Sequence, residues 1–77
     1  MTAPRKISAI AYDIRRTWAK PYFAAVPYLE ALSTLSTVND MYICEDAKSI
    51  ILYFLSNAAT FRGPEAKALK AELKALL

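Results

Sequence analysis

The first stretch of the chain carries apolar side chains at a helical spacing. They lie at i, i+3, i+4, i+7 and i+11, on one face of a helix, and are Ile7, Ile10, Ala11, Ile14 and Trp18. Arg5, Asp13 and Arg16 point away from that face. Pro4 suits the first turn of such a helix, and Pro21 ends it because the residue before a proline is pushed out of helical conformation.

A second periodic stretch contains a proline. Its apolar positions are Tyr22, Val26, Leu29, Leu32 and Leu35. A proline inside a helix removes a hydrogen bond and costs about 3 kcal/mol, whereas the first turn tolerates it. We therefore expect a helix from Pro27 to about Leu35, preceded by a short turn over residues 21–26. Asn39 and Asp40 indicate a turn after it.

The most apolar segment covers residues 50–55, and its period alone does not distinguish a strand from a helix. Its flanks favour a helix, because Glu45 and Asp46 put negative charge at the start and Gly63 supplies a terminator. This predicts a helix over residues 46–60. Since that helix is apolar nearly all round, we expect the others to pack around it.

The last helix is predicted to open at Gly63-Pro64-Glu65, because proline suits its first turn and an acidic side chain suits its positive end. Leu69, Leu73 and Leu76 form its buried edge, and Lys67, Lys70 and Lys74 form the opposite side. Together these segments predict an all-α fold: a compact three- to four-helix bundle with a central apolar helix, in one domain spanning residues 1–77.

The amino-acid composition excludes several kinds of functional site. The 77 residues include no histidine and one cysteine, Cys44, so a zinc site with several Cys and His ligands and an internal disulfide are excluded. An unpaired thiol suits a reducing cytoplasm. Residues 50–55 are too short to cross a membrane, and the N-terminus has no apolar signal segment. We expect a cytoplasmic protein that uses no cofactor or metal.

Catalytic groups are sparse. Without histidine, a nucleophile would need a lysine or carboxylate as its base, and no such set converges in the sequence. Glu45 and Asp46 could bind Mg²⁺, but adjacent acids at a helix start more often interact with the helix dipole. Cys44 is better interpreted as a small packing residue than as a reactive thiol. We therefore expect a protein that is not an enzyme.

Basic residues gather at the two ends of the chain. Residues 1–20 carry a net charge of +4, residues 21–61 carry −3 and residues 62–77 carry +2, for a total of +3. Lys70 and Lys74 are like charges at i, i+4, which costs a helix a few tenths of a kcal/mol. With Arg62 and Lys67 they form a candidate site for nucleic acid or protein, and the alternative is an ordinary solvated face.

Aromatic residues are concentrated in the first half of the chain. They are Tyr12, Tyr22, Phe23, Tyr28 and Tyr42. We expect most of them to pack inside, but the neighbours Tyr22 and Phe23 cannot both face one core, so one of them is predicted to be exposed. Exposed aromatic residues are favoured anchors at protein interfaces.

Three phrases carry a resemblance to known proteins. They are Tyr22-Phe23-Ala24-Ala25-Val26-Pro27-Tyr28-Leu29, Ile51-Leu52-Tyr53-Phe54-Leu55-Ser56-Asn57-Ala58, and Phe61-Arg62-Gly63 followed by Lys70-Ala71-Glu72-Leu73-Lys74. In this order the chain resembles a group of short bacteriophage-encoded proteins, notably from phages of actinobacteria. That group has no assigned chemistry, so the resemblance implies a genomic setting and no activity.

The preferred functional hypothesis is a small protein-binding domain. In a phage setting this means an accessory or host-takeover factor that binds a host or phage protein complex. The alternative is a small basic nucleic-acid-binding protein with a loose helix-turn-helix arrangement of its last two helices. The candidate binding residues are Arg62, Lys67, Lys70, Lys74, Tyr22 and Phe23. A homodimer through the apolar edge of the last helix is a further possibility.

Overall fold

The computed structural model describes residues 5–43 and 45–77. The described residues form helices α1 (Ile7–Thr17), α2 (Val26–Leu32), α3 (Ala47–Ser56) and α4 (Pro64–Lys74), and strands β1 (Met41–Tyr42) and β2 (Glu45–Asp46). The sequence-based predictions for Pro4 and Cys44 fall outside these residues.

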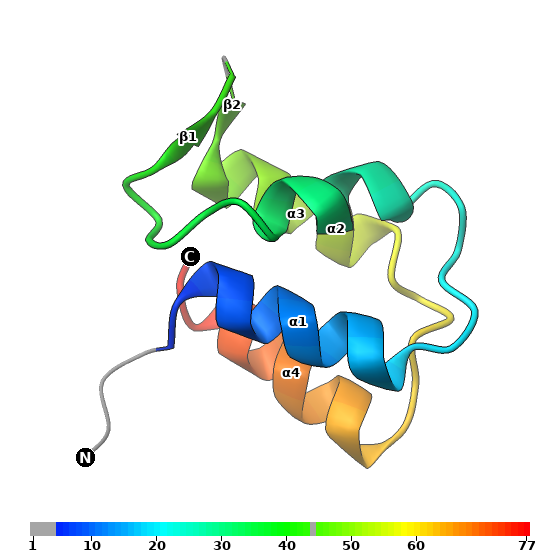
Figure 1. The fold of residues 1–77 in the computed structure, drawn as a ribbon. Helices are drawn as coiled ribbons and strands as arrows, with labels where there is room; N and C mark the ends of the chain where they lie inside the picture. Colours follow the sequence, from blue (N-terminus) through cyan, green and yellow to red (C-terminus); the bar gives the residue numbers. More distant parts are fainter. Residues whose placement is uncertain (1–4, 44) are drawn as a thin grey trace.

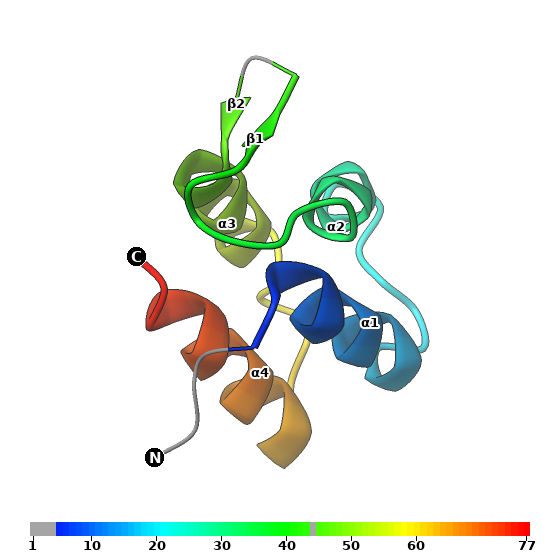
Figure 2. The same cartoon turned by 60° about the vertical axis from the view of Figure 1, so that its left-hand side comes forward.

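Two helix pairs build the fold. α1 lies beside α4 and α2 beside α3, and the helices of each pair run in opposite directions (Figure 1). The two pairs are stacked, with α1 in contact with α2 across the middle (Figure 2). The prediction that α3 is central is wrong, because α3 packs mainly on α2 and leaves Leu52 and Tyr53 exposed.

The predicted apolar face of α1 is confirmed. Ile7, Ile10, Ala11, Ile14 and Trp18 are all buried in one core. Lys6, which directly precedes the helix, makes no side-chain hydrogen bond that caps it. Instead, the backbone N–H groups of Ile7 and Ser8 donate to the carbonyls of Ser36 and Leu35, at 3.0 and 2.8 Å. Because these N–H groups have no partner within the helix, the bonds tie α1 to the loop after α2.

α2 begins with Pro27 in its first turn, as predicted, but it ends at Leu32 and not near Leu35. The hydroxyls of Ser33 and Thr34 donate to the carbonyls of Leu29 and Ala31. Such bonds compete with helix continuation. The predicted turn near Asn39 and Asp40 is confirmed by a hydrogen bond from the Asp40 N–H to the Thr37 carbonyl, 3.0 Å long.

A short β-hairpin follows this turn. Met41 pairs with Asp46 and Tyr42 with Glu45 in antiparallel register. Ile43, at its tip, has a φ of 59°. The all-α prediction is thus correct for the helices and misses the hairpin, because a pair of two-residue strands leaves no periodic signal.

α3 begins where Asp46 caps it, with the carboxylate accepting a 2.7 Å hydrogen bond from the Ser49 N–H. It ends at Ser56, short of the predicted Thr60. There the Asn57 side chain donates to the Tyr53 carbonyl at 2.8 Å. A polar side chain that bonds the last turn competes with the backbone and favours termination.

α4 begins where it was predicted to open, at Gly63-Pro64-Glu65, and it ends at Lys74. Gly63 precedes it with a φ of 111°, a backbone conformation that glycine adopts without strain, and Pro64 follows in the first turn. Leu69 and Leu73 are buried and Leu76 is partly buried. The Arg5 guanidinium ties α4 to α1, because it donates to the Glu72 carboxylate at 2.6 Å and to the Asp13 carboxylate at 2.6 Å.

Candidate functional site

The four predicted basic residues line one hollow of about 760 Å³, formed by α4 and the loop before it. We call it the basic hollow; its lining is Phe61, Arg62, Gly63, Pro64, Lys67, Lys70, Ala71 and Lys74. From Lys67 onward, the α4 members follow the spacing i, i+3, i+4 and i+7, which puts them on one helix face. The structure therefore brings together the basic residues that the sequence singled out.

The wall of the basic hollow is aromatic. Phe61 is 3% exposed, and its ring stacks on the Trp18 indole with centroids 5.0 Å apart. Trp18 in turn meets Phe54 edge to face, with centroids 6.2 Å apart. The Lys70 ammonium lies 5.7 Å from the Phe61 ring centroid, a cation–π geometry. Lys70 is thus held against the core and not extended into water.

Positive charge is crowded in this hollow. Burial lowers the pKa of Lys70, and the neighbouring charges of Lys74 and Arg62 lower the pKa further. None of the ion pairs found in residues 5–43 and 45–77 involves Arg62, Lys67, Lys70 or Lys74. An anion placed here would relieve the repulsion between the like charges.

The aromatic part of the predicted site lies elsewhere. Tyr22 and Phe23 occupy the connection between α1 and α2, and neither lines the basic hollow. One of them was expected to be exposed, but both are, at 43% and 78%. Their rings contact each other, with centroids 5.0 Å apart and planes inclined by 63°.

The expectation that most of the five early aromatic residues pack inside is wrong. Tyr12, like Tyr22 and Phe23, is exposed, whereas Tyr28 and Tyr42 are partly buried. Isoleucine, leucine, Trp18 and the two phenylalanines of the second half fill the core in their place. A two-layer fold of this size has little interior, so the remaining aromatic residues stay at the surface.

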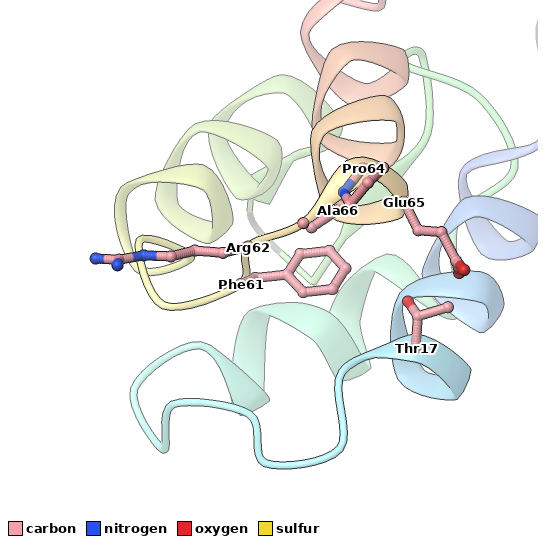
Figure 3. Close-up of a pocket in the computed structure, with 7 residues that line it drawn as sticks. Thr17, Phe61, Arg62, Pro64, Glu65 and Ala66 are labelled. Atoms are coloured by element: carbon pink, nitrogen blue, oxygen red, sulfur yellow. The ribbon is translucent and has the colours of Figure 1, made fainter.

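A second, smaller hollow of about 350 Å³ lies where the end of α1 meets the start of α4. Figure 3 shows the Glu65 carboxylate and the Thr17 side chain approaching each other there, while Arg62 extends away. The Thr17 hydroxyl donates to the Asp13 carbonyl at 2.8 Å. A hydroxyl bonded to backbone and one carboxylate do not make a nucleophile with its base.

The acidic pair near α3 is explained by the local fold. Asp46 caps the helix, and that hydrogen bond lowers the pKa of its carboxyl group. Glu45 lies in β2. Within residues 5–43 and 45–77, no three His, Cys, Asp or Glu side chains are grouped closely enough to hold a metal ion. Asp46 therefore does what an acid at a helix start was expected to do.

The geometry of α3 and α4 differs from that of a helix-turn-helix. In that motif a turn of about three or four residues joins two helices that pack on each other. Here residues 57–63 separate them, and each packs mainly on another partner, α2 or α1.

The apolar edge of α4, through which a homodimer was considered, is covered within the chain itself, because Leu69 and Leu73 lie in the core.

Comparison with known proteins yields no relative. No family model matches the chain, and neither a curated protein nor a solved structure matches it. Of the helices that the structure describes, none combines the length and the apolar character needed to cross a membrane.

Phe61 is a residue of the candidate site that the sequence did not single out. Its position directly before Arg62 and Gly63 was noted, but its role as the wall under Lys70 was not. One sequence feature could have pointed to Phe61: an aromatic residue that directly precedes a charged loop and a basic helix. It does not say which cation the ring contacts, because that depends on how α4 packs on α1.

Proposed function

We propose that this protein is a non-enzymatic protein-binding domain that holds an acidic segment of another protein in the basic hollow. The observation that supports this most is the grouping of Arg62, Lys67, Lys70 and Lys74 around one concave surface, where no acid of the described residues pairs with them. Pro64, Ala71 and the lysine stems add apolar surface between the charges. A peptide with carboxylates beside apolar side chains complements that mixture.

A nucleic acid fits the same hollow less well. Single-stranded binders stack bases on open aromatic faces, whereas Phe61 is buried between Trp18 and Lys70. Duplex readers combine Arg or Lys with Asn or Gln at base edges, and the basic face of α4 carries lysines without Asn or Gln. Nucleic-acid binding therefore remains the alternative, and it predicts a different outcome in the experiment below.

Tyr22 and Phe23 extend the proposal to a second contact. An exposed aromatic pair at the surface is typical of interface anchors, because burying such rings against a partner contributes much of the binding free energy. The resemblance to phage proteins adds the setting: an accessory or host-takeover factor whose partner is a host or phage protein complex in the host cytoplasm. No cofactor is part of this proposal.

The test compares two double charge reversals of equal net charge. Lys70→Glu with Lys74→Glu changes the basic hollow, and Lys20→Glu with Lys48→Glu changes exposed lysines that do not line it. Fluorescence anisotropy measures binding of a labelled peptide of glutamate and leucine, and separately of a labelled DNA duplex. We expect only the hollow variant to lose peptide affinity, by at least about tenfold, because it places like charges together.

Two results would count against protein binding at this site. Equal loss of peptide affinity in both double variants would mean that net charge alone attracts the probe. Tight duplex binding by the wild type, falling steeply with salt and lost only in the hollow variant, would establish the nucleic-acid alternative instead.

A further inference from the structure

A third hollow, of about 430 Å³, opens between α2, α3 and the hairpin. We call it the tyrosine hollow; it is lined by Pro27, Tyr28, Glu30, Ala31, Tyr42, Glu45, Ile50 and Tyr53. It shares no residue with the basic hollow. Figure 2 shows the hairpin rising from the α2–α3 pair, on the far side of the molecule from α4.

Local geometry explains why these side chains meet. On α2, Pro27, Glu30 and Ala31 lie at i, i+3 and i+4 along one helix face, and Tyr28 lies beside them, three residues before Ala31. On α3, Ile50 and Tyr53 are three residues apart and share a face. The hairpin register sets Tyr42 directly opposite Glu45, so the two side chains stand on the same face of the small sheet.

Three tyrosines form the aromatic walls. The rings of Tyr28 and Tyr53 have centroids 5.5 Å apart and planes inclined by 38°. Tyr28 and Tyr42 are partly buried against the core, and Tyr53 is 46% exposed. The face of an aromatic ring carries partial negative charge, so tyrosines around one hollow favour a cation at its centre.

Two carboxylates strengthen this preference. Glu30 and Glu45 line the hollow, and no lysine or arginine does. In the described part of the chain neither carboxylate forms an ion pair or a side-chain hydrogen bond. The hollow thus combines three tyrosine rings with two carboxylates that have no partner among the described residues.

From this arrangement we infer that the tyrosine hollow binds a methylated ammonium group. Methylation makes an ammonium large, apolar at its surface and weakly hydrated, so aromatic rings can replace its water at little cost, while the carboxylates balance its charge. A primary ammonium carries a tighter hydration shell, and a neutral group of the same shape gains nothing from the charges. The cationic group binds inside the tyrosine hollow, and the rest of the ligand lies at its rim.

The experiment titrates ¹⁵N-labelled protein with choline chloride and, in parallel, with the neutral carbon isostere of choline. We expect choline to shift the amide signals of residues around Tyr28, Tyr42 and Tyr53, with saturation. The isostere should bind at least about tenfold more weakly, as expected for a desolvated cation–π contact. Equal shifts by both compounds, or no saturating shift with choline, would overturn the inference.

Matched variants locate the site. Tyr53→Leu should weaken choline binding about three- to tenfold through loss of one ring, whereas Tyr12→Leu, an exposed tyrosine outside the hollow, should leave it unchanged. Glu30→Gln with Glu45→Gln keeps the shape and should also weaken binding, whereas Glu65→Gln should not. Retained affinity in both hollow variants, with native-like spectra, would refute the assignment.

One further pair of probes identifies the source of the ammonium group. A short peptide carrying trimethyllysine is compared with free choline by the same titration. Tighter binding of the peptide indicates a modified protein side chain as the natural ligand, and equal affinity indicates a small molecule. Both outcomes support the site, whereas equal binding of the unmethylated peptide would contradict its preference for methylation.

Discussion

The Trp18 indole lies on the Phe61 ring with centroids 5.0 Å apart and planes inclined by 24°. Trp18 follows the last residue of α1, and Phe61 lies in the loop that leads into α4, so this stack packs the end of α1 against that loop. The contact of Trp18 with Phe54 of α3 joins the two helix pairs. The stack also supports the wall on which Lys70 rests. Stability and the basic hollow therefore depend on the same aromatic contact.

Phe61→Ala should lower the free energy of unfolding by about 3–5 kcal/mol, because it leaves a cavity under the only tryptophan. Urea unfolding followed by Trp18 fluorescence measures the change. Phe23→Ala is the matched control, and at 78% exposure it should change stability by less than about 0.5 kcal/mol. If Phe61→Ala changed stability as little as the control does, Phe61 would not be a core residue.

The hairpin tip offers a stabilising substitution. Ile43 has a φ of 59° and is 83% exposed, so a β-branched side chain adopts a left-handed conformation without packing in return. Ile43→Asn should raise the free energy of unfolding by about 1 kcal/mol, because asparagine tolerates this conformation. Urea denaturation measures the change. A loss of stability would mean that Ile43 makes contacts that offset its strain.

Acid should destabilise the fold through two carboxylates in particular. Hydrogen bonds from the N–H groups of Ser36 and Thr37 lower the pKa of Asp40, and Arg5 and Arg16 lower that of Asp13. Such groups stabilise the folded state above the unfolded aspartate pKa of about 3.9, and this contribution is lost as pH falls through the lower folded pKa.

The midpoint urea concentration should therefore stay level down to about pH 5 and fall below about pH 4. Asp40→Asn should be less stable near neutrality and show a shallower fall. Glu30→Gln serves as control, because the Glu30 carboxylate accepts no hydrogen bond from the described residues. An unchanged acid profile in Asp40→Asn would exclude Asp40 as a source of the pH dependence.

Anion binding in the basic hollow should weaken at alkaline pH, because Lys70 loses its charge there. Its pKa is lowered in the free protein by burial and by the charges of Lys74 and Arg62, and an anion in the hollow favours the charged ammonium. Binding should take up a proton and weaken as pH rises toward the ordinary lysine pKa of about 10.4. The measurement is anisotropy with the acidic peptide over that range.

Lys70→Arg isolates this effect, because arginine stays charged throughout the range. The variant should bind the peptide at neutral pH and lose less affinity as pH rises. Lys67 and Lys74 line the same hollow and remain lysines in both proteins, so the comparison reports on position 70 alone. An identical pH profile for the two proteins would argue against titration of Lys70.

Much of the local structure follows from the sequence. Pro27, Gly63 and Pro64 mark helix starts, and the buried face of α1 follows from its apolar spacing, because these features act within one or two turns of backbone. The same spacing grouped Lys67, Lys70 and Lys74. The basic residues of the candidate site were therefore predictable from the sequence, and its aromatic wall was not.

Tertiary packing decided the rest. The hairpin depends on backbone pairing across a turn, and the position of α3 depends on which helix pairs form. Arg5 reaches Glu72 from the opposite end of the chain, and Lys70 lies over Phe61 because α4 packs on α1. The sequence alone determined where helices begin and which faces are apolar, since short-range sterics and periodicity control both. Only the folded chain determined which faces meet, because those contacts join residues far apart in sequence.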